Sequence, residues 1–291
     1  MNNHRDYSCP PPLKSANSNS FRHNFKILKN KYILHYTQYN DNMLNMYNIF
    51  NVKFMLRSKN YQAAFTLAEV LVTLGLIGIV AAMTLPSLIG NYQKKQTAIR
   101  LKEAYSLLNQ AIQQSELKNG EINSWNFGTA HGNAQESVEF IDTYIAPFLK
   151  VTNKCYNRCI PKVTKHTLSG KEYRFYLEDK TYYGRSIFIA NGMQIWVYTD
   201  SDEAIKIAGI VVDINADRAP NLVGRDIFFF ELKNNSTQVT LQGYKNSREV
   251  MLNNNAEGCN TTAGNVAGRY CGALIQHDGW EIREDYPWKN K

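Results

Sequence analysis

A single long apolar segment constrains the fold of this chain more than any other feature of its sequence. From Ala63 to Gly90 the chain reads AAFTLAEVLVTLGLIGIVAAMTLPSLIG, and Glu69 is the one charged residue within it. The stretch from Phe65 to Ile89 is 25 residues long, and roughly 20 residues suffice for an α-helix to cross the hydrocarbon core of a bilayer. The segment therefore predicts a membrane-spanning helix. Its position as the first helix and the short basic leader before it favour an N-terminus inside the cell and a body outside.

Three kinds of protein carry such a segment, and Glu69 discriminates between them. The first is a secreted protein with an ordinary signal peptide, cut near Ala81-Ala82. The second is an uncleaved signal anchor with an unrelated outer domain, and the third is a prepilin. A carboxylate inside an apolar helix costs roughly 2.5–3.5 kcal/mol on insertion scales, and it indicates a function that needs a charged partner. A signal peptide or simple anchor has no use for that cost, so the prepilin interpretation is favoured.

The residues around Glu69 resemble the prepilin cleavage and methylation motif of type IV pilin-like proteins. The sequence from 64 to 70 is AFTLAEV. In that family a prepilin peptidase cuts just before the Phe on the cytoplasmic side and methylates the new amine, which implies cleavage between Ala64 and Phe65 here. Glu69 matches the hallmark Glu of the family, and Pro86 matches its helix proline. The residue before the cut is usually Gly, and Ala64 departs from that pattern, which bears on the efficiency of cleavage.

The resemblance implies a structural subunit that assembles into a filament. Glu69 would pair with the positive amine of Phe65 in a neighbouring subunit, which offsets the desolvation of both charges in lipid. Such a head-to-tail pairing repeats along a helical array that does not close. The implied partners are other pilin or pseudopilin subunits, prepilin peptidase and the bacterial inner membrane. The chain would cross that membrane once, with its N-terminus cytoplasmic and its head periplasmic or extracellular.

Within this family, the expected function is that of a pseudopilin of a type II secretion system. One alternative is a minor type IV pilin for adhesion or DNA uptake. An alternative of another class is a signal-anchored envelope protein, either a binding module or an enzyme, without a role in a filament. Cleavage before Phe65 and dependence on Glu69 separate the first two functions from the third.

The first 64 residues are interpreted as a leader rather than as part of the fold. Residues 55–64 form a short basic prepilin leader with its own Met55. Residues 1–54 are rich in Asn, Tyr and Lys and are interpreted as a start-site extension, with a long cytoplasmic leader as the alternative. The expected organisation is a leader at 1–64, a transmembrane and filament-core helix at 65–89, and a head at 90–291.

The net charge of +8 raises the question of a nucleic-acid partner. Residues 1–64 contain nine Lys or Arg and two Asp or Glu, whereas the remaining residues contain 24 and 23. The excess of positive charge is therefore confined to the leader. No nucleic-acid partner is expected, because the charge gives no reason to propose a binding face on the head.

The head is predicted to begin with a continuation of the apolar helix. Apolar residues recur at helical spacing from Leu101 to Ile112 with polar residues between them, which indicates an amphipathic helix. This helix should run to about Lys118, and Gly120 is its natural stop. A helix from Phe65 to Lys118 would be roughly 80 Å long at 1.5 Å per residue.

After Lys171 the sequence indicates strands. Asn191-Gly192 between two β-rich runs predicts a hairpin, and the absence of βαβ alternation predicts an antiparallel sheet. The fold class is therefore α+β, a long N-terminal helix packed on a C-terminal antiparallel sheet, which is also the pilin-like fold. The strand candidates are Tyr173–Glu178, Ser186–Ala190, Met193–Thr199, Ile205–Ile214, Asp226–Leu232 and Gln238–Leu241.

The segment VVDINADRAPNLVGRDIFFFEL resembles the Asp-x-Asn…Pro-Asn…Gly-x-Asp-x-Phe segment of many pseudopilin-like proteins. Asp213, Asn215 and Asp217 place carboxylate and amide oxygens at alternate positions, and calcium prefers such oxygen ligands. Major pseudopilins of secretion systems hold calcium in this half of the chain, so the resemblance implies a candidate calcium site. The other interpretation is an Asx-rich turn between two strands. No other cofactor is expected.

Four cysteines follow the apolar segment: Cys155, Cys159, Cys259 and Cys271. An even number of cysteines beyond a membrane segment predicts disulfides in an oxidising compartment. A disulfide between Cys259 and Cys271 would hold a loop without regular structure. The alternative is a four-cysteine zinc site, although the C-x3-C and C-x11-C spacings differ from the usual paired C-x2-C pattern.

Aromatic residues mark two further parts of the expected core. Trp125 and Phe127 are predicted to cover the sheet. Trp280, Tyr286 and Trp288 in the C-terminal tail are predicted to pack against the sheet, with exposure to a neighbouring subunit or client as the alternative.

No catalytic motif indicates an enzyme. The sequence shows no nucleophile motif, no phosphate-binding glycine loop and no paired metal-binding histidines. His166 and His277 are single histidines in predicted loops. A pairing of Cys155 with His166 is conceivable, but export favours a disulfide at this cysteine.

Overall fold

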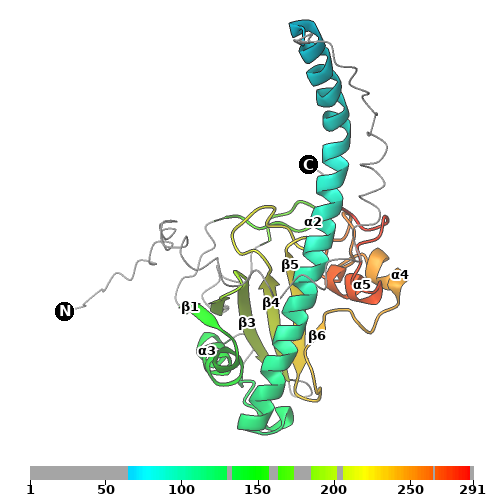
Figure 1. The fold of residues 1–291 in the computed structure, drawn as a ribbon. Coiled ribbons are helices and arrows are strands. Elements are labelled where there is room, and N and C mark those ends of the chain that lie inside the picture. Colours follow the sequence, from blue (N-terminus) through cyan, green and yellow to red (C-terminus); the bar gives the residue numbers. More distant parts are fainter. Residues whose placement is uncertain are drawn as a thin grey trace, which may run out of the picture. The chain divides into compact units, whose positions relative to one another are not determined.

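The computed structural model describes residues 65–129, 133–156, 163–173, 185–201, 206–264 and 266–288. The chain divides into two units, Met1–Thr66 and Leu67–Lys291. Within the described residues, all helices and strands lie in the second unit, which contains one long helix, a six-stranded sheet and several short helices (Figure 1). Helix first and sheet second is the α+β, pilin-like architecture that the sequence predicts.

Helix α2, Leu67–Asn119, is continuous for 53 residues and contains Pro86. Among the described residues it is the one helix long and apolar enough to cross a membrane. From Ala98 to Ser115 its buried residues recur at spacings of three and four, as expected where one face of a helix packs on a core. Gly120 follows the helix with a φ of +84°, a left-handed conformation that glycine adopts at little cost. The predicted helix and its stop are confirmed.

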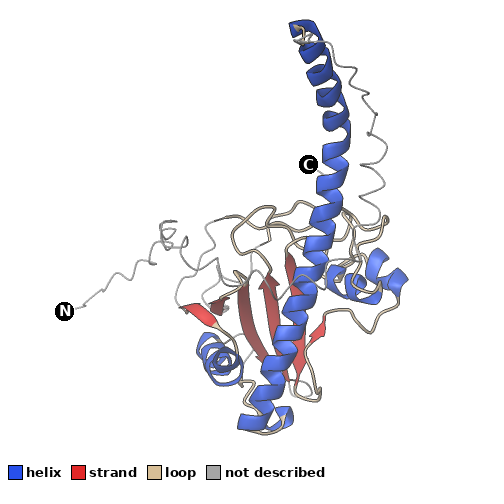
Figure 2. Cartoon of the chain, in the orientation of Figure 1, coloured by secondary structure: helices blue, strands red, loops and turns tan. Residues whose placement is uncertain are grey.

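Six strands form one antiparallel sheet in the order β1-β2-β3-β4-β5-β6, so each strand pairs with its sequence neighbours (Figure 2). The β2–β3 hairpin turns at Asn191-Gly192, where Gly192 has a φ of +84° and donates its N–H to the carbonyl of Ile189 at 2.9 Å. This hairpin and the antiparallel topology are confirmed. The strands are β1 Val151–Cys155, β2 Arg185–Ile189, β3 Gln194–Ser201, β4 Lys206–Asp213, β5 Ile227–Lys233 and β6 Thr240–Leu241.

The two faces of the sheet carry separate apolar clusters. One cluster includes buried residues of α2 together with Ile195, Val197, Ile210, Val212, Phe228 and Phe230. The residues between these, Trp196, Val211 and Phe229, belong to a second cluster. Trp196 pairs with Val211 across the ladder, and Val211 pairs with Phe229. Both sets alternate with a period of two, so β3, β4 and β5 are buried on both faces.

Short helices cover the edges of the sheet. Trp125 and Phe127 are buried beside α3, as expected, and the ring of Trp125 stacks on that of Tyr144 with 4.4 Å between centroids. The short elements are η1 Ile122–Ser124, α3 Ala134–Phe140, η2 Ile141–Ile145, η3 Ala146–Phe148, α4 Arg248–Asn253 and α5 Cys271–His277.

Strand β1 and helix α5 are not among the elements that the sequence predicts. Strand β1 is mostly exposed and its residues lack an apolar pattern, so its hydrogen bonds come from pairing with β2. Helix α5 begins at Cys271, directly after the loop that was expected to lack regular structure, and its small residue Gly272 packs against Leu241. The expected strand Tyr173–Glu178 lies outside the described residues except for Tyr173, which is not in a strand.

Candidate functional site

The N-terminal motif lies at the start of α2. Phe65 and Thr66 precede the helix, and Glu69 lies in its first turn, where a negative charge interacts favourably with the helix dipole. Phe65 is 85% exposed, and Glu69 is exposed as well. Ala64, the residue expected before the cut, lies outside the described residues. The expected new N-terminus and Glu69 are thus within a few residues of each other at one exposed end of the helix.

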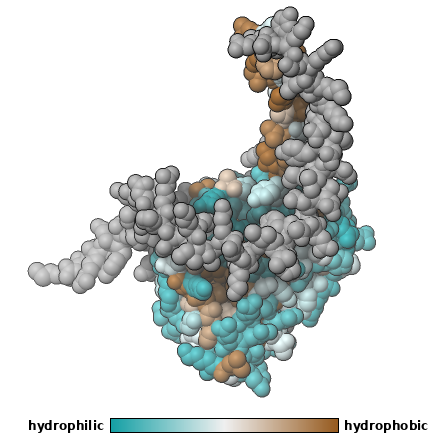
Figure 3. Space-filling model, in the orientation of Figure 1, coloured by the Kyte–Doolittle hydropathy of each residue, from teal (hydrophilic) through white to brown (hydrophobic). Residues whose placement is uncertain are grey.

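The first half of α2 presents apolar side chains on every side. Large apolar residues from Phe65 to Ile89 are exposed around the whole helix, and Figure 3 shows them as a brown column beyond the teal surface of the head. A helix that is apolar all round is stable in lipid or among other apolar helices. This half of α2 therefore needs a membrane or neighbouring subunits around it.

A buried ion pair lies at the end of β4. Nζ of Lys165 contacts Oδ2 of Asp213, and both side chains are at most 1% exposed. The same nitrogen lies 3.3 Å from Oδ1 of Asn221 and 3.9 Å from Oδ1 of Asp217. It also lies 5.3 Å from the centroid of the Trp196 ring, within the range of a cation–π interaction. The ammonium group is therefore enclosed by the Asx-rich segment and one aromatic face.

The carboxylates around this ion pair are strongly affected by burial. Burial raises the pKa of Asp213 to about 7, although Lys165 opposes that shift. Burial also raises the pKa of Asp226. The carboxylate of Asp226 accepts the backbone N–H groups of Asn221 at 2.7 Å and Leu222 at 2.6 Å. Asp226 therefore closes the loop that follows β4 with its own hydrogen bonds.

The three residues expected to hold calcium lie in one turn, and the carboxylate of Asp213 already has other partners. The N–H of Asn215 donates to Oδ1 of Asp213 at 3.1 Å, which is the geometry of an Asx turn. A calcium ion would have to displace Lys165 from Asp213, because the ammonium occupies that carboxylate. In the part of the chain that the structure describes, no group of three or more His, Cys, Asp or Glu residues could hold a metal. The carboxylate of Asp213 is thus paired with an internal ammonium, whereas Oδ1 of Asn215 and Oδ1 of Asp217 are buried without a hydrogen-bond partner among the described residues.

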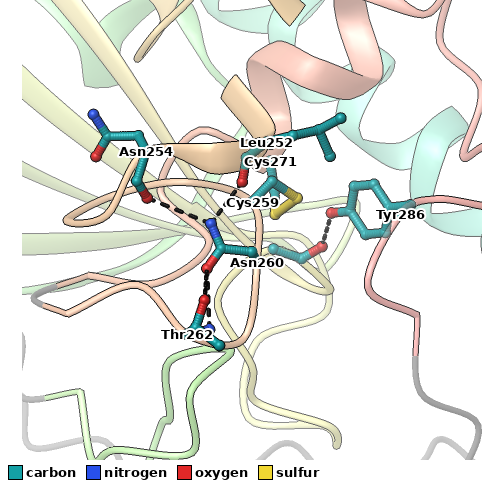
Figure 4. Close-up of a disulfide and its surroundings, with 8 residues drawn as sticks. Leu252, Asn254, Cys259, Asn260, Thr262, Cys271 and Tyr286 are labelled. Carbon is teal, nitrogen blue, oxygen red and sulfur yellow. Dashed lines mark hydrogen bonds between the residues drawn. A yellow bond between two sulfur atoms is a disulfide. The ribbon is translucent and has the colours of Figure 1, made fainter. Parts of the chain in front are cut away.

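Two of the four cysteines form a disulfide, Cys259–Cys271 (Figure 4). Nδ2 of Asn260 donates to the carbonyl of Leu252 at 2.6 Å, which anchors the loop beside the disulfide. Cys155 is also disulfide-bonded, and Cys159 lies outside the described residues. Because three of the four sulfurs are in disulfide bonds, they are not thiolate ligands for zinc.

The C-terminal tail is fixed to the head by aromatic residues. Tyr286 is 4% exposed, and its hydroxyl donates to the carbonyl of Gly224. The guanidinium carbon of Arg225 lies 4.0 Å from the centroid of the Trp288 ring. Tyr286 is therefore buried as expected, and Trp288 has a partner within its own chain.

An arginine between two carboxylates holds the same tail at a second point. Arg248 donates to both oxygens of Asp278, each at 2.8 Å, and to both oxygens of Asp285 at 2.8 and 2.9 Å. The bonds from Arg248 lower the pKa of Asp285. Burial alone would raise the pKa of Asp278, but Arg248 outweighs it, so this pKa is also lowered. The folded state therefore favours both carboxylates in their charged form.

Comparison with known proteins assigns most of the chain to a family. Residues 87–290 match the model of a family of unknown function, DUF6613. The chain belongs to DUF6613. Residues 59–85 match the prokaryotic N-terminal methylation motif, so this DUF6613 chain is a type IV pilin-like precursor, as its sequence indicates. A search of curated proteins and a search of solved structures returned no match.

Two residues that organise the DUF6613 head were not identified from the sequence. Lys165 stands 48 residues before Asp213, and no local motif connects the two. Arg248 likewise stands 30 residues before Asp278. Only the fold brings these charges together, so the sequence carries no spacing signal that could have found them.

Proposed function

We propose that this protein is a pseudopilin of a type II secretion system, a structural subunit stored in the inner membrane and assembled into a filament. The observation that carries the proposal is the methylation motif at the start of an apolar helix that continues without a break into the head. A continuous helix couples the buried filament core directly to the exposed head. A subunit of this kind can transmit movement of the filament core to the head.

Assembly would depend on the first five residues of the processed chain. Prepilin peptidase would cut between Ala64 and Phe65, which leaves a positive amine at Phe65. In lipid, the carboxylate of Glu69 and the amine of an adjacent subunit each carry a large desolvation cost, and their pairing offsets it. The exposed apolar faces of neighbouring α2 helices would then pack against each other and exclude lipid.

The head supports a location outside the cytoplasm. The Cys259–Cys271 bond and the disulfide at Cys155 are typical of proteins that fold in an oxidising compartment. The excess of positive charge lies in the residues before the apolar helix, on the side that we assign to the cytoplasm. These features support a head in the periplasm, where a secretion filament would act.

Replacement of Glu69 tests the proposal. We expect Glu69→Gln to reduce recovery of the subunit in filaments by at least about tenfold, since the loss of one partner of a buried ion pair costs several kcal/mol. Glu103→Gln removes an exposed acid from the same helix outside the membrane and should leave recovery within about twofold, because exposed charges contribute little. The measurement is the amount of subunit in sheared filaments relative to the amount in membranes.

A parallel deletion in the host separates the two pilin-like functions. If the protein is a pseudopilin, its deletion blocks the release of secreted proteins and leaves surface pili intact. Loss of pili or of DNA uptake with normal secretion would instead establish a minor type IV pilin. Wild-type recovery of the Glu69→Gln subunit in filaments would contradict the pairing of Glu69 with the Phe65 amine for either function.

A further inference from the structure

A pocket lined by three arginines lies where α2 enters the head. Its volume is about 570 Å³. One wall is the stretch of α2 from Tyr92 to Arg100, and the other wall is the loop between β4 and β5. The side chains that matter for its chemistry are those of Tyr92, Arg100, Arg218, Arg225, Asp226 and Trp288.

The pocket has an excess of positive charge that the fold holds in place. Arg100 donates to the carbonyls of Ile214 at 2.5 Å and Asn191 at 3.2 Å, which fixes its guanidinium at the pocket wall. Arg225 is fixed by its stacking on Trp288. Arg218 is exposed at the rim.

One carboxylate faces these three guanidinium groups. It belongs to Asp226, and its oxygens accept the backbone N–H groups of Asn221 and Leu222. The pocket therefore remains net positive. Guanidinium groups bind phosphate oxygens through paired hydrogen bonds, so a phosphate group is the ligand that suits this charge pattern.

The position of the pocket along α2 indicates where such a phosphate would come from. The apolar stretch ends at Ile89, and the pocket wall lies 3 to 11 residues beyond it, which is about 5–16 Å at 1.5 Å per residue. The headgroup layer on each side of a bilayer is about 5–8 Å thick. Tyr and Trp are enriched at this depth, and Tyr92 and Trp288 line the pocket. With Ile89 at the edge of the hydrocarbon core, the Tyr92 end of the pocket would lie at the level of the lipid headgroups.

We propose that this pocket binds the phosphodiester headgroup of an anionic phospholipid in the leaflet from which the head emerges. The bound headgroup would hold the head in one orientation on the membrane until the subunit enters the filament. This inference rests on the proposed membrane-stored subunit, although it requires only insertion of α2 and not a particular secretion system.

Reconstitution of the full chain in lipid nanodiscs tests the pocket. The nanodiscs contain phosphatidylcholine alone or with phosphatidylglycerol as about one third of the lipid, and tryptophan fluorescence reports the Tm of the head. We expect phosphatidylglycerol to raise the Tm of the wild-type chain by about 3 °C, since a ligand that binds only the folded state stabilises it. Arg218→Gln should abolish most of that shift, whereas Lys95→Gln should retain it. Both side chains are exposed and the two changes remove the same charge, but only Arg218 lines the pocket.

Each other outcome overturns the proposal. An equal loss of the shift in both variants would indicate diffuse attraction to an anionic surface, and no shift in the wild-type chain would indicate no binding. If inorganic phosphate added to phosphatidylcholine nanodiscs gave the same Tm shift, the ligand would be free phosphate rather than a lipid. The N-terminal mass of the chain recovered from host membranes reports prepilin processing separately, so failure of the pocket leaves the proposed function testable on its own.

Discussion

The ammonium of Lys165 and the carboxylate of Asp213 form an ion pair with both side chains at most 1% exposed. Removal of one partner leaves a buried charge without compensation, which typically costs about 3–5 kcal/mol. We therefore expect Lys165→Met to lower the free energy of unfolding by about 3 kcal/mol or more. Chemical denaturation of the full chain in detergent micelles measures the change.

A second substitution distinguishes loss of the pair from simple misfit of the methionine. Lys165→Met combined with Asp213→Asn removes both charges and keeps an acceptor for the N–H of Asn215. The double variant should recover about 1–2 kcal/mol relative to Lys165→Met alone, because position 213 no longer carries a buried charge without a partner. A Lys165→Met protein as stable as the wild type would show that the ion pair has no structural role.

The same geometry predicts how the head responds to calcium. The ammonium of Lys165 already lies among the oxygens of Asp213, Asn221 and Asp217, so we expect a chelator to change the Tm of the wild-type head by less than about 1 °C. In Lys165→Met the carboxylates lose that cation, and millimolar calcium should raise the Tm of this variant by several degrees. A large drop in the wild-type Tm on chelation would establish a calcium site at this loop instead.

The Cys259–Cys271 bond closes a short loop between α4 and α5. A loop of this length is expected to contribute about 3 kcal/mol, mainly because it limits the unfolded chain. We therefore expect replacement of both cysteines by alanine to lower the free energy of unfolding by about 3 kcal/mol. Thermal unfolding with and without reductant measures the contribution of this disulfide. In the double variant, reductant should have no effect on the loop between residues 259 and 271, because that bond is already absent. An unchanged unfolding free energy in the double variant would contradict the prediction.

Arg248 makes the docking of the tail sensitive to acid. It lowers the pKa of Asp278 and Asp285 in the folded state below their values in the unfolded chain. The folded state therefore binds fewer protons in this range, so its stabilisation is present above pH of about 4 and is lost as the pH falls through the folded-state pKa values. Tm measured from pH 6 to pH 3 should fall less steeply for Arg248→Gln than for the wild type. Equal slopes of Tm against pH for the two proteins would show that the ion pairs of Arg248 do not contribute to stability.

The sequence predicted those parts of the fold that carry a continuous local pattern. The helix expected from Phe65 to Lys118 is observed from Leu67 to Asn119, because its first half is a long apolar run and its second half has apolar residues at helical spacing. Strands β2 to β5 were predicted to within two residues of their observed bounds because each is a short run rich in β-branched and aromatic residues. Glu69 stood out because a charge in an apolar run has a large cost.

The sequence did not predict the features that depend on contacts between residues far apart in the chain. Strand β1 is mostly exposed and gains its hydrogen bonds from β2, so its own residues carry no strand pattern. The partners of Asp213 and Asp278 are lysine and arginine residues far away in the chain. A surface lysine and a buried lysine look alike in a sequence, so no sequence pattern predicts the contact between Lys165 and Asp213.

The N-terminal mass of the chain recovered from host membranes tests the central claim most directly. The account predicts a mature chain that begins at N-methylated Phe65, with Ala64 and all preceding residues removed. A chain that begins near Met83 would contradict it, because ordinary signal-peptidase cleavage would leave a soluble exported domain without Glu69. An intact chain from Met55 would contradict it as well, because the uncleaved leader would leave no amine at Phe65 to pair with Glu69.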